Sequence, residues 1–173
     1  MRNLPPSFFQ RDVLEVAPEL LGKKLIRKFE DGSINQFTIT EVEAYRGMED
    51  RACHASKGRT ARTEVMFHAG GVVYVYLIYG MYWLLNIVTG KEGDASAVLI
   101  RGLQGISGPG RVGRALRLDK SFYGEDLITS DRIWIEDSDL KPEFITTPRI
   151  GINYAGEPWV SKPWRFVVLK NTP

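Results

Sequence analysis

The sequence predicts an α+β fold: one domain in which a curved antiparallel β-sheet, built from β-hairpins, carries a few peripheral helices. Strand-like segments outnumber helical ones, and short glycine-containing turns join most of them. Strands do not alternate with long helices, as they would in a doubly wound parallel sheet. The chain has 173 residues and an apolar fraction of 43%, which suffice for a buried core without disulfides.

Two hairpins and one further strand are expected to form the centre of the sheet. Residues 24–29 and 36–45 are joined at Asp31-Gly32, which is a strong hairpin signal. Residues 72–79 and 82–88 form a second predicted hairpin across Gly80. The remaining predicted strands follow later in the chain, at residues 95–103, 132–136, 148–153 and 164–169.

Short helical segments are expected around this sheet. Pro18 and the following Glu-Leu-Leu suggest a helix near the N-terminus, because proline is favoured in a first helical turn. Residues 46–59 are polar and expected to be irregular, and residues 60–67 suggest a short helical turn. Gly108-Pro109-Gly110 is expected to open a helix over residues 111–118, with Val112, Ala115 and Leu116 facing the core and three arginines facing solvent: Arg111, Arg114 and Arg117.

Composition limits the cellular setting. The chain has no apolar run long enough to span a bilayer, and its N-terminus lacks the features of a signal peptide. The single cysteine, Cys53, cannot form an internal disulfide, which suits a reducing compartment. We therefore expect a cytoplasmic protein, associated with the nucleoid if it is bacterial, with no membrane partner.

Charge is distributed unevenly. Residues 125–143 hold seven acidic and two basic residues, which gives this segment a net charge of −5. Because the whole chain has a net charge of +2, the remaining residues together carry +7. Basic residues gather between Arg51 and Arg62 and again at 111–117. A basic surface of this kind suits a polyanionic partner such as nucleic acid. Lysines and arginines that only keep the protein soluble are the alternative.

Two carboxylates occupy alternate positions of one predicted strand. In Ile39-Thr-Glu41-Val-Glu43-Ala-Tyr45, the residues Glu41, Glu43 and Tyr45 share one face, and Val42 and Ala44 point the other way. Neighbouring carboxylates raise each other's affinity for a proton, and a carboxylate beside an aromatic ring is a suitable base for activating water. A solvated polar face is the alternative.

The second hairpin carries tyrosines in unusual positions. Tyr74 and Tyr76 share a face, whereas Tyr79 falls at the hairpin tip, where an exposed ring is suited to insertion between base pairs. With a turn centred near Met81, Asn86 is expected opposite Tyr76, so that an amide lies beside a stacking ring. The alternative is that tyrosine simply favours strands, which explains Tyr79 poorly.

A metal site is not expected. The chain has two histidines, His54 and His68, and no CxxC or HExxH spacing, so His54 is more readily interpreted as a hydrogen-bonding or ring-edge contact. The stretch Gly108-Pro-Gly110-Arg111 is a weak phosphate cradle at a helix start and lacks the Walker and Rossmann patterns.

Taken in order, these segments resemble the alkyladenine, or 3-methyladenine, DNA glycosylase family found in animals and many bacteria. The matching stretches are LLGKKL, EVEAYRGMEDRACHAS, MF, VYVYLIYGMYWLLNI, AVLIRGL, GPGRVGRAL, KSF, RIGINYAGE and KPWRF. The resemblance implies that residues 1–173 form one DNA glycosylase domain, without metal or organic cofactor. It also implies a monomer that acts on double-stranded DNA containing damaged purines.

The resemblance also implies roles for individual residues. Glu43 resembles the general base for the attacking water, and Tyr79 resembles the residue that fills the gap left by the flipped base. Tyr45, His54 and Tyr76 resemble the walls that stack on that base. Three further roles are implied: Asn86 for contacts at the base edge, Arg101 beside the backbone of the flipped nucleotide, and Gly110 with Arg111 on the DNA backbone.

The expected activity is hydrolysis of the N-glycosidic bond of alkylated or deaminated purines, leaving an abasic site without strand cleavage. The substrate class comprises 3-methyladenine, 7-methylguanine, hypoxanthine and ethenoadenine. The chain departs from the family pattern in its short connection at residues 102–107, where relatives carry a long insertion, and in its MFHAGG segment. Two alternatives remain open: a non-catalytic nucleic-acid binding module, and a metal-dependent nuclease using Glu41, Glu43, Glu49 and Asp50.

Overall fold

The long strand β2 (Ile34–Tyr45) organises the sheet in the computed structural model, which describes residues 2–170. Its first half pairs with β1 (Lys24–Lys28), and its second half pairs with β5 (Ser96–Leu103) on one side and β9 (Arg165–Val168) on the other. The register shifts on both sides of Glu41, as expected where a bulge bends a strand. The two carboxylates of β2 therefore lie where the sheet changes its pairing partners.

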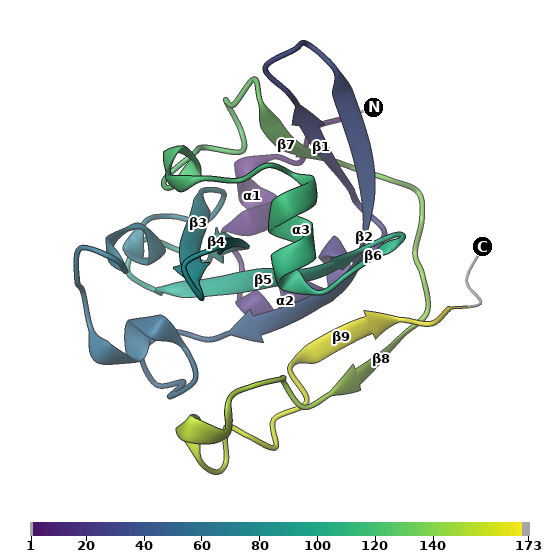
Figure 1. The fold of residues 1–173 in the computed structure, drawn as a ribbon. Helices are drawn as coiled ribbons and strands as arrows, with labels where there is room; N and C mark the ends of the chain where they lie inside the picture. Colours follow the sequence, from purple (N-terminus) through teal and green to yellow (C-terminus); the bar gives the residue numbers. More distant parts are fainter. Residues whose placement is uncertain (1, 171–173) are drawn as a thin grey trace.

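The other strands extend this antiparallel sheet. The strand order is β3 (Val73–Ile78), β4 (Tyr82–Thr89), β5, β2, β1 and β7 (Ile133–Glu136). The short strand β6 (Ile106–Ser107) pairs with β5, and β8 (Phe144–Thr147) pairs with β9, beside the end of β2 (Figure 1). These nine strands of residues 2–170 curl into the predicted α+β fold, which the structure confirms.

Three α-helices within the described residues 2–170 accompany the sheet. Figure 1 shows α3 (Pro109–Ala115) in front of it and α1 (Pro6–Phe9) and α2 (Val13–Leu20) behind it. Helix α2 packs against β2 and β5, and α3 packs against β4 and β5. Within residues 2–170, no helix has the length and apolar character that crossing a membrane requires. The short 3-10 turns are η1 (His54–Lys57), η2 (Glu64–Phe67), η3 (Lys120–Phe122) and η4 (Asn153–Ala155).

The N-terminal helix begins earlier than predicted. Asp12 caps it by accepting a hydrogen bond of 2.9 Å from the Leu14 amide, and Pro18 lies in its last turn rather than its first. The apolar residues that α2 buries follow helical spacing, so the amphipathic pattern decides the boundary instead of the proline: Val13, Val16, Ala17 and Leu20.

The predicted strand at residues 148–153 is wrong. The strand ends at Thr147, and the following residues form a segment without a ladder partner. Pro148 has no amide hydrogen to donate, the Ile150 amide bonds to the Glu43 side chain, and Gly151 has a φ of 74°. The alternating apolar residues that suggested a strand instead belong to a segment that covers part of the central sheet.

The register of the second hairpin also differs from the prediction. Asn86 lies opposite Tyr74, not Tyr76, and Tyr76 lies opposite Leu84. The turn is centred on Gly80 rather than Met81, and moving the centre of a hairpin by one residue shifts its register by two. The Met81 amide bonds to the Ile78 carbonyl at 3.0 Å.

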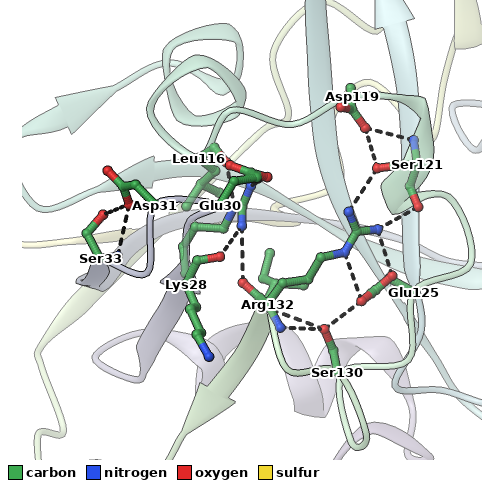
Figure 2. Close-up of polar contacts among 12 residues, drawn as sticks. Lys28, Glu30, Asp31, Ser33, Leu116, Asp119, Ser121, Glu125, Ser130 and Arg132 are labelled. Atoms are coloured by element: carbon green, nitrogen blue, oxygen red, sulfur yellow. Dashed lines mark hydrogen bonds and ion pairs between the residues drawn. The ribbon is translucent and has the colours of Figure 1, made fainter.

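A cluster of polar side chains holds the beginning of the acidic segment, residues 125–143, against the sheet (Figure 2). Arg132 donates to Glu125 and to Ser121, with a distance of 2.9 Å between Arg132 Nη2 and Glu125 Oε2. The buried Arg27 donates to the Leu116 carbonyl, just beyond α3, at 2.8 Å. Some of the local negative charge is therefore balanced within the fold.

Candidate active site

One row of side chains crosses four strands of the sheet. Tyr74 on β3 pairs with Asn86 on β4, Asn86 pairs with Leu99 on β5, and Leu99 pairs with Glu43 on β2. Cross-strand partners lie on the same face, so this register brings the tyrosine, the amide and the carboxylate onto one surface. The next residues along β2, Val42 and Ala44, face the main hydrophobic core, as predicted.

A cavity of about 280 Å³ opens on this face. Asn86 and Arg101 contribute polar groups to its wall, and Ile150, Gly151 and Ile152 line one side. Its rings come from β2, η1, β3 and the segment after β8, which are distant in sequence: Tyr45, His54, Tyr74, Tyr76 and Tyr154. An aromatic cavity with few polar groups is the usual form of a site for a flat organic ligand.

Glu43 lies directly behind the wall of this cavity, with no exposed surface. The Tyr45 hydroxyl donates to its Oε1 at 2.8 Å, and the Ile150 amide donates to its Oε2 at 2.6 Å. Arg101 Nη1 lies 3.7 Å from Oε1. All three of these neighbours line the cavity, so the carboxylate is one side chain away from any occupant.

Burial raises the pKa values of both Glu43 and Tyr45. Desolvation raises the pKa of Glu43 above its usual value, although Arg101, the Ile150 amide and the Tyr45 hydroxyl oppose the shift. Desolvation, followed by the charge of Glu43, raises the pKa of Tyr45 well above the usual value for tyrosine. Tyr45 therefore keeps its proton and remains a donor, whereas Glu43 is a stronger base than an exposed carboxylate.

His54 and Tyr76 meet at the aromatic wall. His54 Nδ1 lies 2.9 Å from the Tyr74 hydroxyl, and the His54 and Tyr76 rings are 4.6 Å apart in an edge contact. Burial first, then the charges of Arg62 and Lys57, lowers the pKa of His54 to about 4. His54 is therefore neutral near pH 7, and the cavity gains no positive charge from it.

The remaining predicted site residues fall in different places. Asn86 is 4% exposed, and its amide nitrogen donates to the Tyr74 carbonyl at 3.2 Å. Tyr79 is 88% exposed at the hairpin tip and contributes to the cavity rim. Arg101 lines the cavity, whereas Arg111 is exposed and lines a separate groove on another side of β5. Gly110 packs on the Tyr82 ring, where an added Cβ would lie 3.0 Å from ring carbons.

The sequence did not predict two residues of the site, Arg149 and Tyr154, because each contacts a residue that is distant in the sequence. Arg149 lies between the Tyr45 and Trp164 rings and forms a buried ion pair with Asp50. Tyr154 donates to the Ala52 carbonyl at 3.0 Å and adds a ring to the cavity. The one available signal was a charged residue, Arg149, inside an otherwise apolar stretch.

Three of the four carboxylates considered for a metal-dependent nuclease, Glu41, Glu43 and Asp50, are engaged by other groups. Glu41 accepts from Arg101 and Arg165, and Asp50 accepts from Arg149. Across the described part of the chain, residues 2–170, no three acidic, histidine or cysteine side chains gather in a way that could hold a metal ion.

Comparison with known proteins identifies the family. The family model described as methylpurine-DNA glycosylase matches residues 7–107 and 104–172. The two matches meet at the short β5–β6 connection, where the sequence lacks the insertion expected from the family pattern.

Three similar proteins each carry the name "Putative 3-methyladenine DNA glycosylase". The protein from Wolbachia pipientis wMel is 49% identical over 97% of this chain and 92% of its own length. The protein from Legionella pneumophila (strain Corby) is 46% identical over 99% and 97%, and that from Methanocella arvoryzae is 43% identical over 100% and 95%. With most of its length matched both by the family model and by these relatives, the chain belongs to the methylpurine-DNA glycosylase family.

Proposed function

We propose that this protein is a monofunctional DNA glycosylase of base-excision repair. It acts as a monomer through one domain spanning residues 1–173, on double-stranded DNA that contains a damaged purine. The purine rotates out of the duplex into the cavity beside Glu43, because a stacked base is out of reach of any side chain. The observation that carries the proposal is the buried Glu43 carboxylate behind an aromatic cavity of a size suited to one base.

The reaction follows from the hydrogen bonds of Glu43. A carboxylate offers about four acceptor sites, and Tyr45 and Ile150 occupy two of them, so about two are left for a water molecule. Because Glu43 has no exposed surface, that water reaches it when the cavity wall moves aside as the damaged base binds. Glu43 takes a proton from that water as its oxygen bonds to C1′ of the sugar. The N-glycosidic bond breaks with its electron pair passing to the purine nitrogen, and an abasic site is left in an intact strand.

The cavity and hairpin supply binding and positioning. Tyr45, Tyr76 and His54 stack on the everted base, and an electron-rich aromatic wall favours a purine made cationic by alkylation. Asn86 contacts the base edge, and Tyr79 enters the gap in the duplex. The proposed substrates are 3-methyladenine, 7-methylguanine, hypoxanthine and ethenoadenine, while Arg101, Gly110 and Arg111 act on the DNA backbone.

The test is base release from duplexes that each contain one of these lesions, with the labelled strand examined before and after alkali. We expect an intact strand before alkali and a cleaved one after it, and unchanged release in EDTA. Binding should weaken steeply with salt because phosphate contacts release counterions. A protein that binds the duplex without releasing any base would instead be the non-catalytic nucleic-acid binding module.

A further inference from the structure

A second carboxylate contacts the arginine beside Glu43. Glu41 Oε1 accepts from Arg101 Nε at 3.3 Å and from Arg165 Nε at 2.7 Å. Arg165 is itself held by Thr147, whose hydroxyl accepts from Arg165 Nη1 at 3.0 Å. The reaction described above gives Glu41 and Arg165 no task, although both side chains are largely buried.

The fold builds this contact from three neighbouring strands. Glu41 pairs with Gly102 on β5 and with Val167 on β9, so the arginines of the two flanking strands approach it from both sides. A Cβ on Gly102 would lie 3.1 Å from Glu41 Cβ and 3.5 Å from its Oε2. A glycine at this position therefore leaves room for the carboxylate to lie between Arg101 and Arg165.

We propose that Glu41, held by Arg165, is a positioning residue that fixes how Arg101 is shared between Glu41 and Glu43. The inference rests on the proposed function, since it concerns the environment of the general base. Arg101 lies 3.3 Å from Glu41 and 3.7 Å from Glu43, and its guanidinium has enough donors to serve both.

This sharing matters because Arg101 opposes the effect of burial on Glu43. If Arg101 moved entirely onto Glu43, the pKa of Glu43 would fall and the carboxylate would be a weaker base. If Arg101 moved entirely onto Glu41, the pKa of Glu43 would rise, and Glu43 would hold its proton when it should be accepting one. The other titratable or charged groups facing Glu43 are Tyr45 on β2, Tyr76 on β3, and Arg149 and Tyr154 after β8.

Two substitutions should therefore have opposite effects. The acid limb of the pH profile is the range in which base release slows as the pH falls and Glu43 takes up a proton. Glu41→Gln removes a nearby negative charge and frees Arg101 for Glu43, so this limb should move to lower pH. Arg165→Gln leaves Glu41 with Arg101 alone and removes a positive charge, so the acid limb should move to higher pH. Arg165→Lys keeps the charge and should restore a limb close to that of the unchanged protein.

The experiment is a single-turnover pH profile of base release, with melting temperature measured for each variant. Glu125→Gln is the matched control, because Glu125 is also a partly buried carboxylate that accepts from an arginine, Arg132, at 2.9 Å. It should leave the acid limb in place. A loss of rate of about tenfold is expected for Arg165→Gln at neutral pH, since small misplacements of catalytic groups are costly.

The outcomes separate this inference from the proposed function. Limbs that stay in place, or that move in the same direction in both variants, would overturn the inference while base release by the unchanged protein continues. If Glu41→Gln does not fold, Arg165→Gln alone decides, and an unshifted limb in that variant overturns the inference. Absence of release by the unchanged protein would instead overturn the proposed function, and with it this inference.

Discussion

The carboxylate of Asp50 and the guanidinium of Arg149 lie 2.6 Å apart with neither side chain exposed, although 99 residues separate them in the sequence. A second bond of 3.0 Å joins Arg149 Nη2 to Asp50 Oδ1, and Arg149 also donates to the Ala44 carbonyl. Because Arg149 immediately precedes Ile150, the same ion pair places the amide that bonds to Glu43. The ion pair that stabilises this part of the fold therefore also positions a hydrogen-bond donor of Glu43.

Replacing Asp50 with asparagine should lower the free energy of unfolding by about 3–5 kcal/mol, because it leaves a buried guanidinium without its counter-ion. Urea unfolding measures this change. The matched control is Asp12→Asn, which breaks the more exposed ion pair with Arg46 and keeps a capping side chain for α2; it should cost less than about 1 kcal/mol. Equal losses in the two variants would contradict the role given to Asp50.

Replacing Glu43 with glutamine should reduce base release by about 100-fold or more, because the proposed general base is lost, while duplex binding is retained. The variant should also change how stability depends on pH. Below the usual pKa of a glutamic acid, both folded and unfolded chains hold the proton and burial has no charge to penalise. As the pH rises through the raised pKa of the folded state, the ionised Glu43 costs the unchanged protein stability that the glutamine variant does not lose.

The stability of the Glu43→Gln variant relative to the unchanged protein should therefore increase as pH rises from the usual pKa of a glutamic acid through the raised pKa of Glu43 in the folded state, in urea unfolding followed at several pH values. A stability difference that stays constant with pH would show that Glu43 carries no burial penalty. Full base release in this variant would remove Glu43 from the reaction altogether.

The low pKa of His54 should make acid conditions destabilising. The folded protein holds His54 neutral down to about pH 4, whereas the unfolded chain takes up a proton near 6.5. This contribution to stability is complete above pH 6.5 and declines as the pH falls toward 4. His54→Gln should remove that part of the pH dependence, and His68→Gln, at an exposed position, should preserve it. Identical curves for the two variants would contradict the buried, neutral state of His54.

Replacing Tyr79 with asparagine should stabilise the fold while weakening base release. Tyr79 has a φ of 51°, in the left-handed region that a bulky residue adopts at a cost and that asparagine tolerates. A gain of about 1 kcal/mol would raise the melting temperature by about 2–4 °C in a chain of this size. Release should fall most on well-paired lesions, where eversion is hardest. A variant that is more stable and equally active would remove Tyr79 from base eversion.

Much of the site could be predicted because strand periodicity is local. Alternation along residues 39–45 correctly placed Glu41, Glu43 and Tyr45 on one face, and Gly80 correctly placed Tyr79 at a tip. The position of Asn86 was wrong by one pairing because the turn centre was wrong by one residue. A register shift of two residues keeps every side chain on the same face of the sheet, so the apolar pattern could not distinguish the two registers.

The contacts that complete the site could not be predicted, because they join distant segments. The Ile150 amide belongs to a stretch whose alternation suggested a strand, and only the tertiary position of Glu43 explains why its donor points elsewhere. The Asp50–Arg149 pair likewise depends on two segments meeting in space. Arg149 is unusual in its apolar stretch, but periodicity and turn signals give no indication of which residue is its partner.

The position of Ile150 in the sequence determines how late in folding and synthesis the surroundings of Glu43 can be completed. Glu43 and the amide that bonds to it are 107 residues apart, so their contact is among those with a high cost of loop closure. During synthesis, Glu43 and the aromatic residues Tyr45, His54, Tyr74 and Tyr76 emerge from the ribosome long before the segment after β8. A nascent chain therefore has no assembled carboxylate site until the segment after β8 has been made.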